Sequence, residues 1–459
     1  MKKNTFSITT PIYHLNVKPH LGNAFPTIAA GILARFKRIQ GKDIFFLTGT
    51  GEHGEKIVLK AIENNKKPKE WTDEMAAYYE LTWDRLEISY NKFIRTTDKK
   101  HKKIVGKVLE ILKKKNLIYK EKYYFFRLSA FQNSLIKLIE NEEIKIEPEK
   151  RRKEVIKFLA VEKLRDIAIS REKIKWAIPL PWDSNQTVYP FFDALISCLT
   201  GFGWGGNLKK WPKYWPSDCQ IIGEDALKFH TLIWLAILLS LEAPLPRLIF
   251  IHGFLTLPFI NLDKMIDTFG AEAVRYLLFS TFSFEEGGEV SLEKFYDKYN
   301  ADLVNGYGNL FSRVLSLLCE IPGKRNVKFR EIDKNFKEKI EFCWGKYIKT
   351  MEKLKFNQSL EIFKELIIFC DKYIDKEKPW NFSKNESGRF EKVLYNLIET
   401  LRHLSLMMMP FMPEKADQAF ESLGILDEAH KKSLDEAQKW AAIKEYKIKK
   451  NFKKLFSKL

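Results

Sequence analysis

The chain has 459 residues, which is too long for a single hydrophobic core, so we expect two or three domains. Its formal net charge is +19. This large excess of positive charge indicates a polyanionic partner, with nucleic acid as the leading candidate. Lysine-rich runs that form solvated faces are the alternative explanation of this charge.

The cysteines and the apolar runs exclude several classes of protein. The five cysteines form no C-x-x-C pair, so neither a zinc knuckle nor a disulfide framework is expected. Residues 1–15 lack the apolar core of a signal peptide, and the most apolar run, 232–241, is too short to span a bilayer. We therefore expect a cytoplasmic protein with reduced thiols and no membrane partner.

The first chemically informative stretch is the corner at residues 9–24. It follows a β-prone run, 5–9, and leads into a long helical pattern, 24–39, so it lies at a strand–turn–helix corner of the kind that binds anions. Gly22 permits close approach of the backbone to a ligand, and His20 is a potential donor to a phosphate. Taken alone, the corner is equally compatible with an ordinary surface turn.

Strand and helix signals alternate through much of the first 262 residues. Compact strands are predicted at 43–48, 218–222 and 248–251, and a basic, mostly helical stretch separates the first of these strands from the other two. This order predicts a Rossmann-like α/β domain with a parallel sheet, divided between residues 1–115 and 165–262. Residues 116–164 are predicted to be a connective insertion.

Beyond residue 262 the strand signals stop and helical periodicity continues to the C-terminus. We predict a junction at 263–300, followed by an all-helical bundle at 301–459, which has a normal domain size. The basic tail, 445–459, is predicted to be a frayed helix.

Several long motifs, in order, carry a resemblance to a known family. They occupy residues 9–23, 46–54, 93–97, 178–183, 269–276 and 299–313. In this order they resemble the methionyl-tRNA synthetases, which are class I aminoacyl-tRNA synthetases, and the chain looks like a shortened and divergent member. The resemblance implies ATP-dependent activation of methionine, with Mg²⁺ as counter-ion, and transfer to tRNA(Met). It also implies a catalytic Rossmann domain followed by an anticodon-binding bundle, and a monomer is expected.

The resemblance assigns roles to individual residues. Those matching the ATP-binding and catalytic positions are His20, Gly22, Asn23, Gly253 and Phe254. Those matching the methionine pocket are Ile12, His14, Phe191, Ala194, Leu195, Cys198 and His230, with Arg171 and Asp225 in supporting positions. Those matching the anticodon-contacting positions are Asn309, Arg313 and Trp380, whose amide, guanidinium and indole groups suit unstacked RNA bases.

The catalytic half departs from the family pattern at several of these positions. Asn23 replaces a histidine, and His14, Phe191 and Cys198 replace larger aromatic residues. Gly51 replaces an aspartate that the family uses for the ammonium group of the substrate, which leaves two carboxylates as substitutes: Asp225 or a shifted Glu52.

A loop of the family pattern is also missing. After 252–256 the family carries a K-M-S-K-S loop that neutralises pyrophosphate, but here 257–262 follows at once, without a lysine or arginine. Asp263-Lys264-Met265 resembles a remnant of that loop, yet we predict it to lie in the following helix. The insertion has no zinc-knuckle cysteines, so no structural zinc is expected.

These departures leave three hypotheses open. The first is a methionine–tRNA ligase. The second is a catalytically impaired or repurposed tRNA-binding paralogue. The third is an enzyme for a different amino acid, because Gly51 and Cys198 alter the pocket.

Overall fold

The computed structural model describes residues 4–172, 174–206, 209–256, 261–319, 326–329, 333–382, 387–449 and 451–459. The chain forms two compact units. The first comprises residues 1–34 and 43–254, and the second comprises residues 35–42 and 255–459. The finer division into a split catalytic domain, an insertion, a junction and a bundle stays a prediction.

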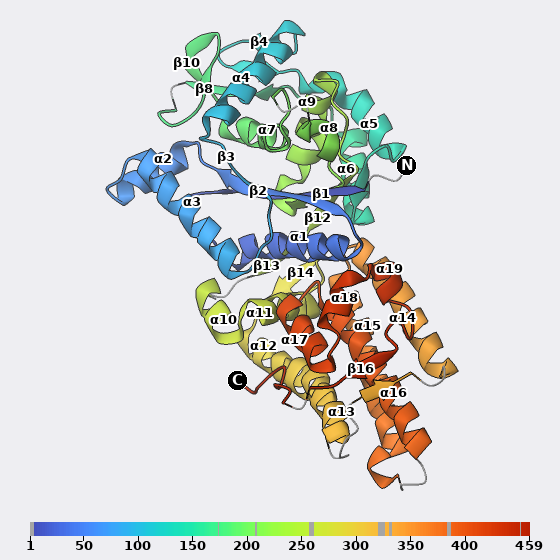
Figure 1. The fold of residues 1–459 in the computed structure, drawn as a ribbon. Coiled ribbons are helices and arrows are strands. Elements are labelled where there is room, and N and C mark those ends of the chain that lie inside the picture. Colours follow the sequence, from blue (N-terminus) through green and yellow to red (C-terminus); the bar gives the residue numbers. More distant parts are fainter. Residues whose placement is uncertain are drawn as a thin grey trace. The chain divides into compact units, whose positions relative to one another are not determined.

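The first unit is built around a six-stranded parallel sheet (Figure 1). One of its two central strands is buried over residues 7–10, with Ile8 paired in register to Phe46 on one side and Cys219 on the other. Such a continuous buried run is typical of a parallel sheet covered on both faces. In spatial order the strands are β3 (Lys92–Arg95), β2 (Asp43–Gly51), β1 (Thr5–His14), β11 (Cys219–Gly223), β12 (Leu248–His252) and β6 (Lys145–Glu147).

Helices cover both faces of this sheet, which confirms the predicted Rossmann-like architecture (Figure 1). Helix α1 (Leu21–Ile39) lies on one face, and α7 (Pro190–Phe202) and α9 (Leu235–Ser240) lie on the other. The remaining elements are α2 (Glu55–Glu63), α3 (Pro68–Arg85), α4 (Lys99–Lys114), β4 (Ile118–Lys120), β5 (Tyr124–Phe126), η1 (Leu128–Phe131), α5 (Gln132–Glu140), α6 (Glu149–Val161), β7 (Ile167–Ala168), β8 (Ser170–Glu172), β9 (Pro179–Leu180), β10 (Asp183–Val188), α8 (Lys210–Tyr214), η2 (Glu224–Ala226) and η3 (Phe229–Trp234). Strand β13 (Phe254–Thr256) follows at the point in the chain where the second unit begins.

The stretch between the two halves of the sheet is less helical than expected. Strands β4 and β5 pair antiparallel, and β7 extends them to a three-stranded sheet. Tyr124 and Phe126, which are good strand formers, bury their rings on one side of this sheet. Strand β6, also from the predicted insertion, pairs with β12 at the edge of the main sheet.

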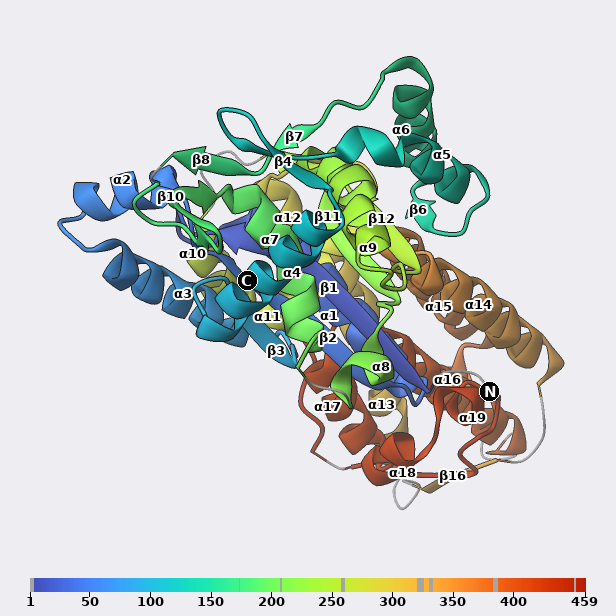
Figure 2. The ribbon, with the colours of Figure 1, turned by 90° about the horizontal axis from the view of Figure 1, so that it is seen from above.

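The second unit is mainly helical, with the long helices α14 (Lys334–Glu352) and α15 (Phe356–Glu377) side by side (Figure 2). Three short strands at 287–289, 326–328 and 445–447 correct the prediction that only helices follow residue 262. Asp263–Met265 lies inside helix α10, which confirms the prediction that it belongs to the helix. The elements are α10 (Leu262–Phe269), α11 (Ala271–Thr281), β14 (Gly287–Glu289), α12 (Leu292–Lys298), η4 (Tyr299–Gly308), α13 (Asn309–Cys319), β15 (Asn326–Lys328), α14 (Lys334–Glu352), α15 (Phe356–Glu377), η5 (Pro379–Asn381), α16 (Ser387–Met408), α17 (Pro413–Leu423), α18 (Leu426–Lys431), α19 (Leu434–Ala437) and β16 (Glu445–Lys447).

The tail corrects one prediction. Residues 445–447 form a strand, β16, antiparallel to β15, and the part of 448–459 that the structure describes contains no helix. Tyr446 points inward and donates a hydrogen bond to the buried carboxylate of Glu399 on α16, while its neighbours in the strand are more exposed. This alternation of buried and exposed residues is a strand period, which the basic composition of the tail obscures.

Candidate active site

A cavity of about 370 Å³ opens at the carboxyl ends of β1 and β11 in the first unit. Its wall takes residues 9–14 from β1, Gln220 and Gly223 from β11, and Gly22 and Asn23 from the start of α1. In an open parallel sheet, ligands bind at this edge, where the strands end and the helices begin.

One face of α7 supplies the apolar side of the cavity. Pro190 occupies the first turn of this helix, where its fixed φ favours helix initiation. Phe191, Ala194, Leu195 and Cys198 then follow at helical spacing, so they share a face, and all four line the cavity. The sequence-predicted methionine pocket is thus continuous on this helix.

Ile12, His14 and His230 complete the predicted methionine set, and all three line the same cavity. The Nδ1–H of His230 donates to the carbonyl of Ala226 at 3.2 Å, which leaves Nε2 as an acceptor. Burial lowers the pKa of His230 to about 4 and raises the pKa of the Cys198 thiol to about 12. Both groups are therefore neutral near pH 7, which suits an apolar side chain.

The nucleotide corner is organised by His20. Its Nδ1 accepts a hydrogen bond from the backbone N–H of Gly22 at 3.1 Å, so the ring proton is on Nε2. The side-chain oxygen of Asn23 accepts from the backbone of His20 and from Tyr79, which fixes the Asn23 amide. Gly22 and Asn23 line the cavity, whereas His20 is an exposed residue outside its lining.

Three other residues predicted for the site differ in whether they line the main cavity. Phe254 lines the cavity and is 51% exposed, but Gly253 does not line it and accepts a hydrogen bond from His252 instead. Arg171 lines a neighbouring cavity of about 750 Å³, where its guanidinium lies 4.1 Å from the ring centroid of Tyr189. His14 and Phe191 line both cavities, so the two are adjacent.

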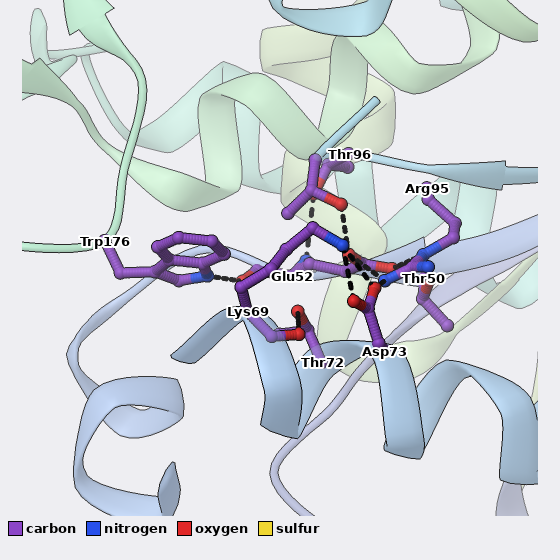
Figure 3. Close-up of polar contacts among 9 residues, drawn as sticks. Thr50, Glu52, Lys69, Thr72, Asp73, Arg95, Thr96 and Trp176 are labelled. Atoms are coloured by element: carbon purple, nitrogen blue, oxygen red, sulfur yellow. Dashed lines mark hydrogen bonds and ion pairs between the residues drawn. The ribbon is translucent and has the colours of Figure 1, made fainter. Parts of the chain in front are cut away.

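Glu52 is not available as a substitute for the missing aspartate, which removes one of the two alternatives. Its buried carboxylate is held by Arg95, with Nε at 2.6 Å and Nη2 at 2.9 Å, and by the hydroxyl of Thr50 (Figure 3). Arg95 also binds Asp73 at 2.7 Å, while the backbone of Glu52 is held by Thr96 and Trp176 (Figure 3). The turn beside Gly51 is therefore fixed.

Charge is sparse on the wall of the main cavity. Among the described residues that line it, Asp225 is the only acid, and no lysine or arginine is present. A Cβ added at Gly51 would meet only Ile12, at 3.6 Å, which is ordinary van der Waals contact. The backbone at Gly51 therefore has room for a Cβ atom.

In the second unit the structure brings two of the three anticodon candidates together. The Arg313 guanidinium lies 5.5 Å from the ring centroid of Trp380, whose indole is 51% exposed. Arg313 also donates to Asp375 at 3.1 Å, and Asn309 lies one turn away on the same helix, α13. The exposed indole agrees with its expected position beside Pro379.

Several lining residues were missed by the sequence reasoning. Thr10 directly follows the predicted strand 5–9, so its position was a usable signal, whereas Gln220 lies inside the predicted strand 218–222. Trp234 and Phe229 belong to a π-helical turn, η3, and His252 ends a buried strand. The apolar sequence around these three residues gives no indication that they face a cavity.

Sequence comparison places this geometry in a family. The profile described as tRNA synthetases class I (M) matches residues 6–124 and 120–315, and that of the anticodon-binding domain of tRNA ligase matches residues 333–459. A methionine–tRNA ligase of Caldanaerobacter subterraneus is 36% identical, over 93% of this chain and 75% of that protein. The chain belongs to the methionyl-tRNA synthetase family.

Other members of the family agree with this assignment. The methionine–tRNA ligase of Bacillus subtilis is 32% identical, and the alignment covers 98% of this chain and 77% of that protein. A crystal structure of Mycobacterium tuberculosis methionyl-tRNA synthetase bound by methionyl-adenylate superposes with a TM-score of 0.91 at 27% identity. That match covers 99% of this chain and 100% of the other.

Two other kinds of feature are absent from the described residues. None of the helices in the described part of the chain is long and apolar enough to cross a membrane. Within the same residues, no group of three or more His, Cys, Asp and Glu side chains is arranged to hold a metal ion. The segment in which the family carries K-M-S-K-S falls at 257–260, outside the described residues.

Proposed function

We propose that the chain is a methionine–tRNA ligase, which converts methionine and ATP to methionyl-adenylate and transfers the methionyl group to tRNA(Met). The observation that carries this proposal is that the residues assigned from the sequence lie together around one cavity. Eleven of the fourteen catalytic-half residues assigned from the sequence line one cavity, in a chain whose relatives are methionine–tRNA ligases. The comparisons lend no support to the alternative of a repurposed tRNA-binding paralogue.

The cavity wall supports binding of the thioether side chain. Phe191, Ala194 and Leu195 provide apolar contact, and the neutral thiol of Cys198 adds a polarisable group. Because Gly51 has no carboxylate and Glu52 is bound by Arg95, we assign Asp225 as the acid that meets the cationic or hydroxyl groups of the bound adenylate. A charge-assisted hydrogen bond of this kind is about twice as strong as a neutral one.

The start of α1 supports binding of the phosphates. This helix has 19 residues, and its N-terminal backbone N–H groups and dipole favour an anion at Gly22. His20 lies two residues before Gly22, and its Nε2–H is free of the bond that Nδ1 makes to the Gly22 backbone. We propose that this Nε2–H donates a hydrogen bond to the α-phosphate as charge develops there. With no lysine or arginine at 255–262, we propose that Mg²⁺ carried by ATP balances the leaving pyrophosphate.

The second unit supports recognition of tRNA. The match of residues 333–459 to an anticodon-binding domain, and the charge of +19, both favour an RNA partner. We propose that Trp380 stacks on one anticodon base while Arg313 and Asn309 hydrogen-bond its edge. We also propose that the protein works as a monomer in the cytoplasm, which size-exclusion chromatography with light scattering and cell fractionation would check.

The test is ATP–pyrophosphate exchange, screened over all twenty amino acids and followed by charging of tRNA(Met). We expect exchange that depends on methionine, and we expect Ala194→Trp, which fills the cavity, to abolish it. Exchange stimulated by a different amino acid would overturn the assigned substrate. Tight tRNA binding without exchange at high enzyme concentration would instead favour the repurposed paralogue.

A further inference from the structure

The second unit contains a concave site that the assigned anticodon residues do not use. It is a groove of about 550 Å³ formed by the start of α14, the end of α15 and the start of α16. Four cationic side chains line it: Lys372, Lys376, Arg389 and Lys392. We call it the cationic groove.

The two carboxylates of the groove are already bound within the protein. Glu377 accepts from Arg389, with Nε at 3.2 Å and Nη2 at 2.8 Å. Asp333 caps the start of α14 by accepting from the N–H groups of Asn335 and Phe336, and its other oxygen accepts from Asn396. Neither carboxylate is therefore available to neutralise the lysines.

Lys372 and Lys376 are four residues apart on α15, so their exposed ammonium groups share one face of the helix. Like charges at this spacing repel each other. Neither side chain makes an ion pair or a hydrogen bond with any residue that the structure describes. An anion between them would relieve the repulsion, so the groove is complementary to negative charge.

Aromatic rings line the same groove. Phe336 packs against Phe369 and Tyr373, with ring centroids 4.9 Å and 4.6 Å apart, so the aromatic wall is rigid. A cationic groove with an aromatic wall is the usual composition of a site for single-stranded nucleic acid. A surface that bound only a free inorganic anion would not need the aromatic wall.

Helix α15 connects this groove to the proposed base-reading site. Asp371 and Asp375 present one face of the helix to Arg313, while Lys372 and Lys376 present the adjacent face to the groove. Trp380 follows Lys376 by four residues, just beyond the end of the helix. An RNA strand whose base stacks on Trp380 thus has its backbone within reach of the groove.

We propose that the cationic groove binds backbone phosphate of the anticodon loop, next to the nucleotide that stacks on Trp380. This inference rests on the proposed tRNA-binding function. Phosphate contacts position RNA without reading its sequence, so the groove contributes affinity and register, and base identity is left to Arg313, Asn309 and Trp380.

The experiment compares tRNA(Met) binding to the full-length wild-type chain, to Lys372→Ala/Lys376→Ala, and to a matched control over a series of salt concentrations. The control is Lys349→Ala/Lys353→Ala, a pair of exposed lysines with the same spacing near the end of α14 and outside the groove. Circular dichroism verifies folding, and Lys372→Gln/Lys376→Gln is a second variant that keeps the side-chain length.

We expect both groove variants to bind tRNA(Met) roughly tenfold more weakly than wild type at 0.1 M salt. The slope of the logarithm of the binding constant against the logarithm of the salt concentration should be shallower by about one for each phosphate that the variant no longer neutralises. The control should stay within about twofold of wild type. A tRNA with one altered anticodon base should show the same fold reduction in affinity for the groove variants, because binding of a phosphate is independent of sequence. Iodine footprinting of phosphorothioate tRNA should show weaker protection of anticodon-loop phosphates.

Groove variants that bind like wild type with an unchanged slope would overturn the inference and leave the proposed function intact. A fold reduction that depends on the anticodon base would overturn it as well, because it would show that the groove touches a base. If the wild-type chain bound tRNA(Met) no better than other RNA, the proposed function would fail first, and this inference with it.

Discussion

The cavity of the first unit and the cationic groove of the second unit differ in the charge of the side chains that line them. Charged side chains near the cavity of the first unit are bound to each other, as Glu52 is to Arg95, and Asp225 alone among the described residues brings a formal negative charge to its wall. In the cationic groove of the second unit, Lys372 and Lys376 make no ion pair with any described residue. The difference indicates that the first site selects by shape and neutral polar groups, and the second by charge.

The largest expected effect comes from breaking the ion pair that withdraws Glu52 from the cavity. Arg95→Leu leaves a fully buried carboxylate without its guanidinium, which costs about 3–5 kcal/mol of unfolding free energy. Urea denaturation measures this destabilisation, and methionine-dependent exchange should fall with it.

Lys69→Ala is the matched control for Arg95→Leu, because Lys69 binds the same Asp73 carboxylate from an exposed position (Figure 3). An exposed pair of this kind contributes less than about 1 kcal/mol. Equal destabilisation by the two variants would contradict a structural role for the Glu52–Arg95 pair.

The next effect is on RNA binding at the second unit. Trp380→Ala removes an exposed indole, and removal of one stacking interaction should weaken tRNA(Met) binding by about 1–3 kcal/mol, or roughly 5- to 150-fold. Fluorescence anisotropy with labelled tRNA measures it. Phe342→Ala, a similarly exposed aromatic on α14, is the control and should change binding little.

A gain is expected from restoring the missing carboxylate beside the first cavity. Gly51→Asp places an anion where a Cβ meets only Ile12, and a charge-assisted hydrogen bond to the ammonium group should lower the KM for methionine about tenfold. Gly51→Ala adds the Cβ without the charge and should change KM less than about twofold. If both variants behave alike, the ammonium group does not bind near this position.

The smallest effect is expected from pH. Burial lowers the pKa of His230 to about 4 and also lowers the pKa of His14. His230 therefore stays neutral above about pH 5, and its protonation adds charge to the cavity only as the pH falls toward 4. Calorimetric titration with methionine should give a Kd that changes less than about twofold between pH 6 and 8. A steep fall in affinity centred near pH 6.5 would show an unshifted histidine on the wall.

Local patterns in the sequence indicated the strand–turn–helix corner of the first site, whereas the residues of the methionine pocket were assigned from the resemblance to the family. The α7 residues follow Pro190 at helical spacing, and Gly22 and Asn23 follow a predicted strand. The state of Glu52 could not be read locally, because it depends on Arg95, 43 residues away. The cationic groove requires the packing of three helices, and nothing in 372–376 alone distinguishes it from a solvated face.

We propose that this chain charges tRNA(Met) with methionine, using a neutral cavity for the amino acid and a cationic surface for the RNA. Charging of tRNA(Met) with labelled methionine at 50 mM and 200 mM salt tests it most directly. We expect methionyl-tRNA to form, the KM for methionine to change less than about twofold between the two salt concentrations, and the KM for tRNA to rise at least about tenfold. No methionyl-tRNA at either salt concentration, or equal salt dependence of the two KM values, would contradict it.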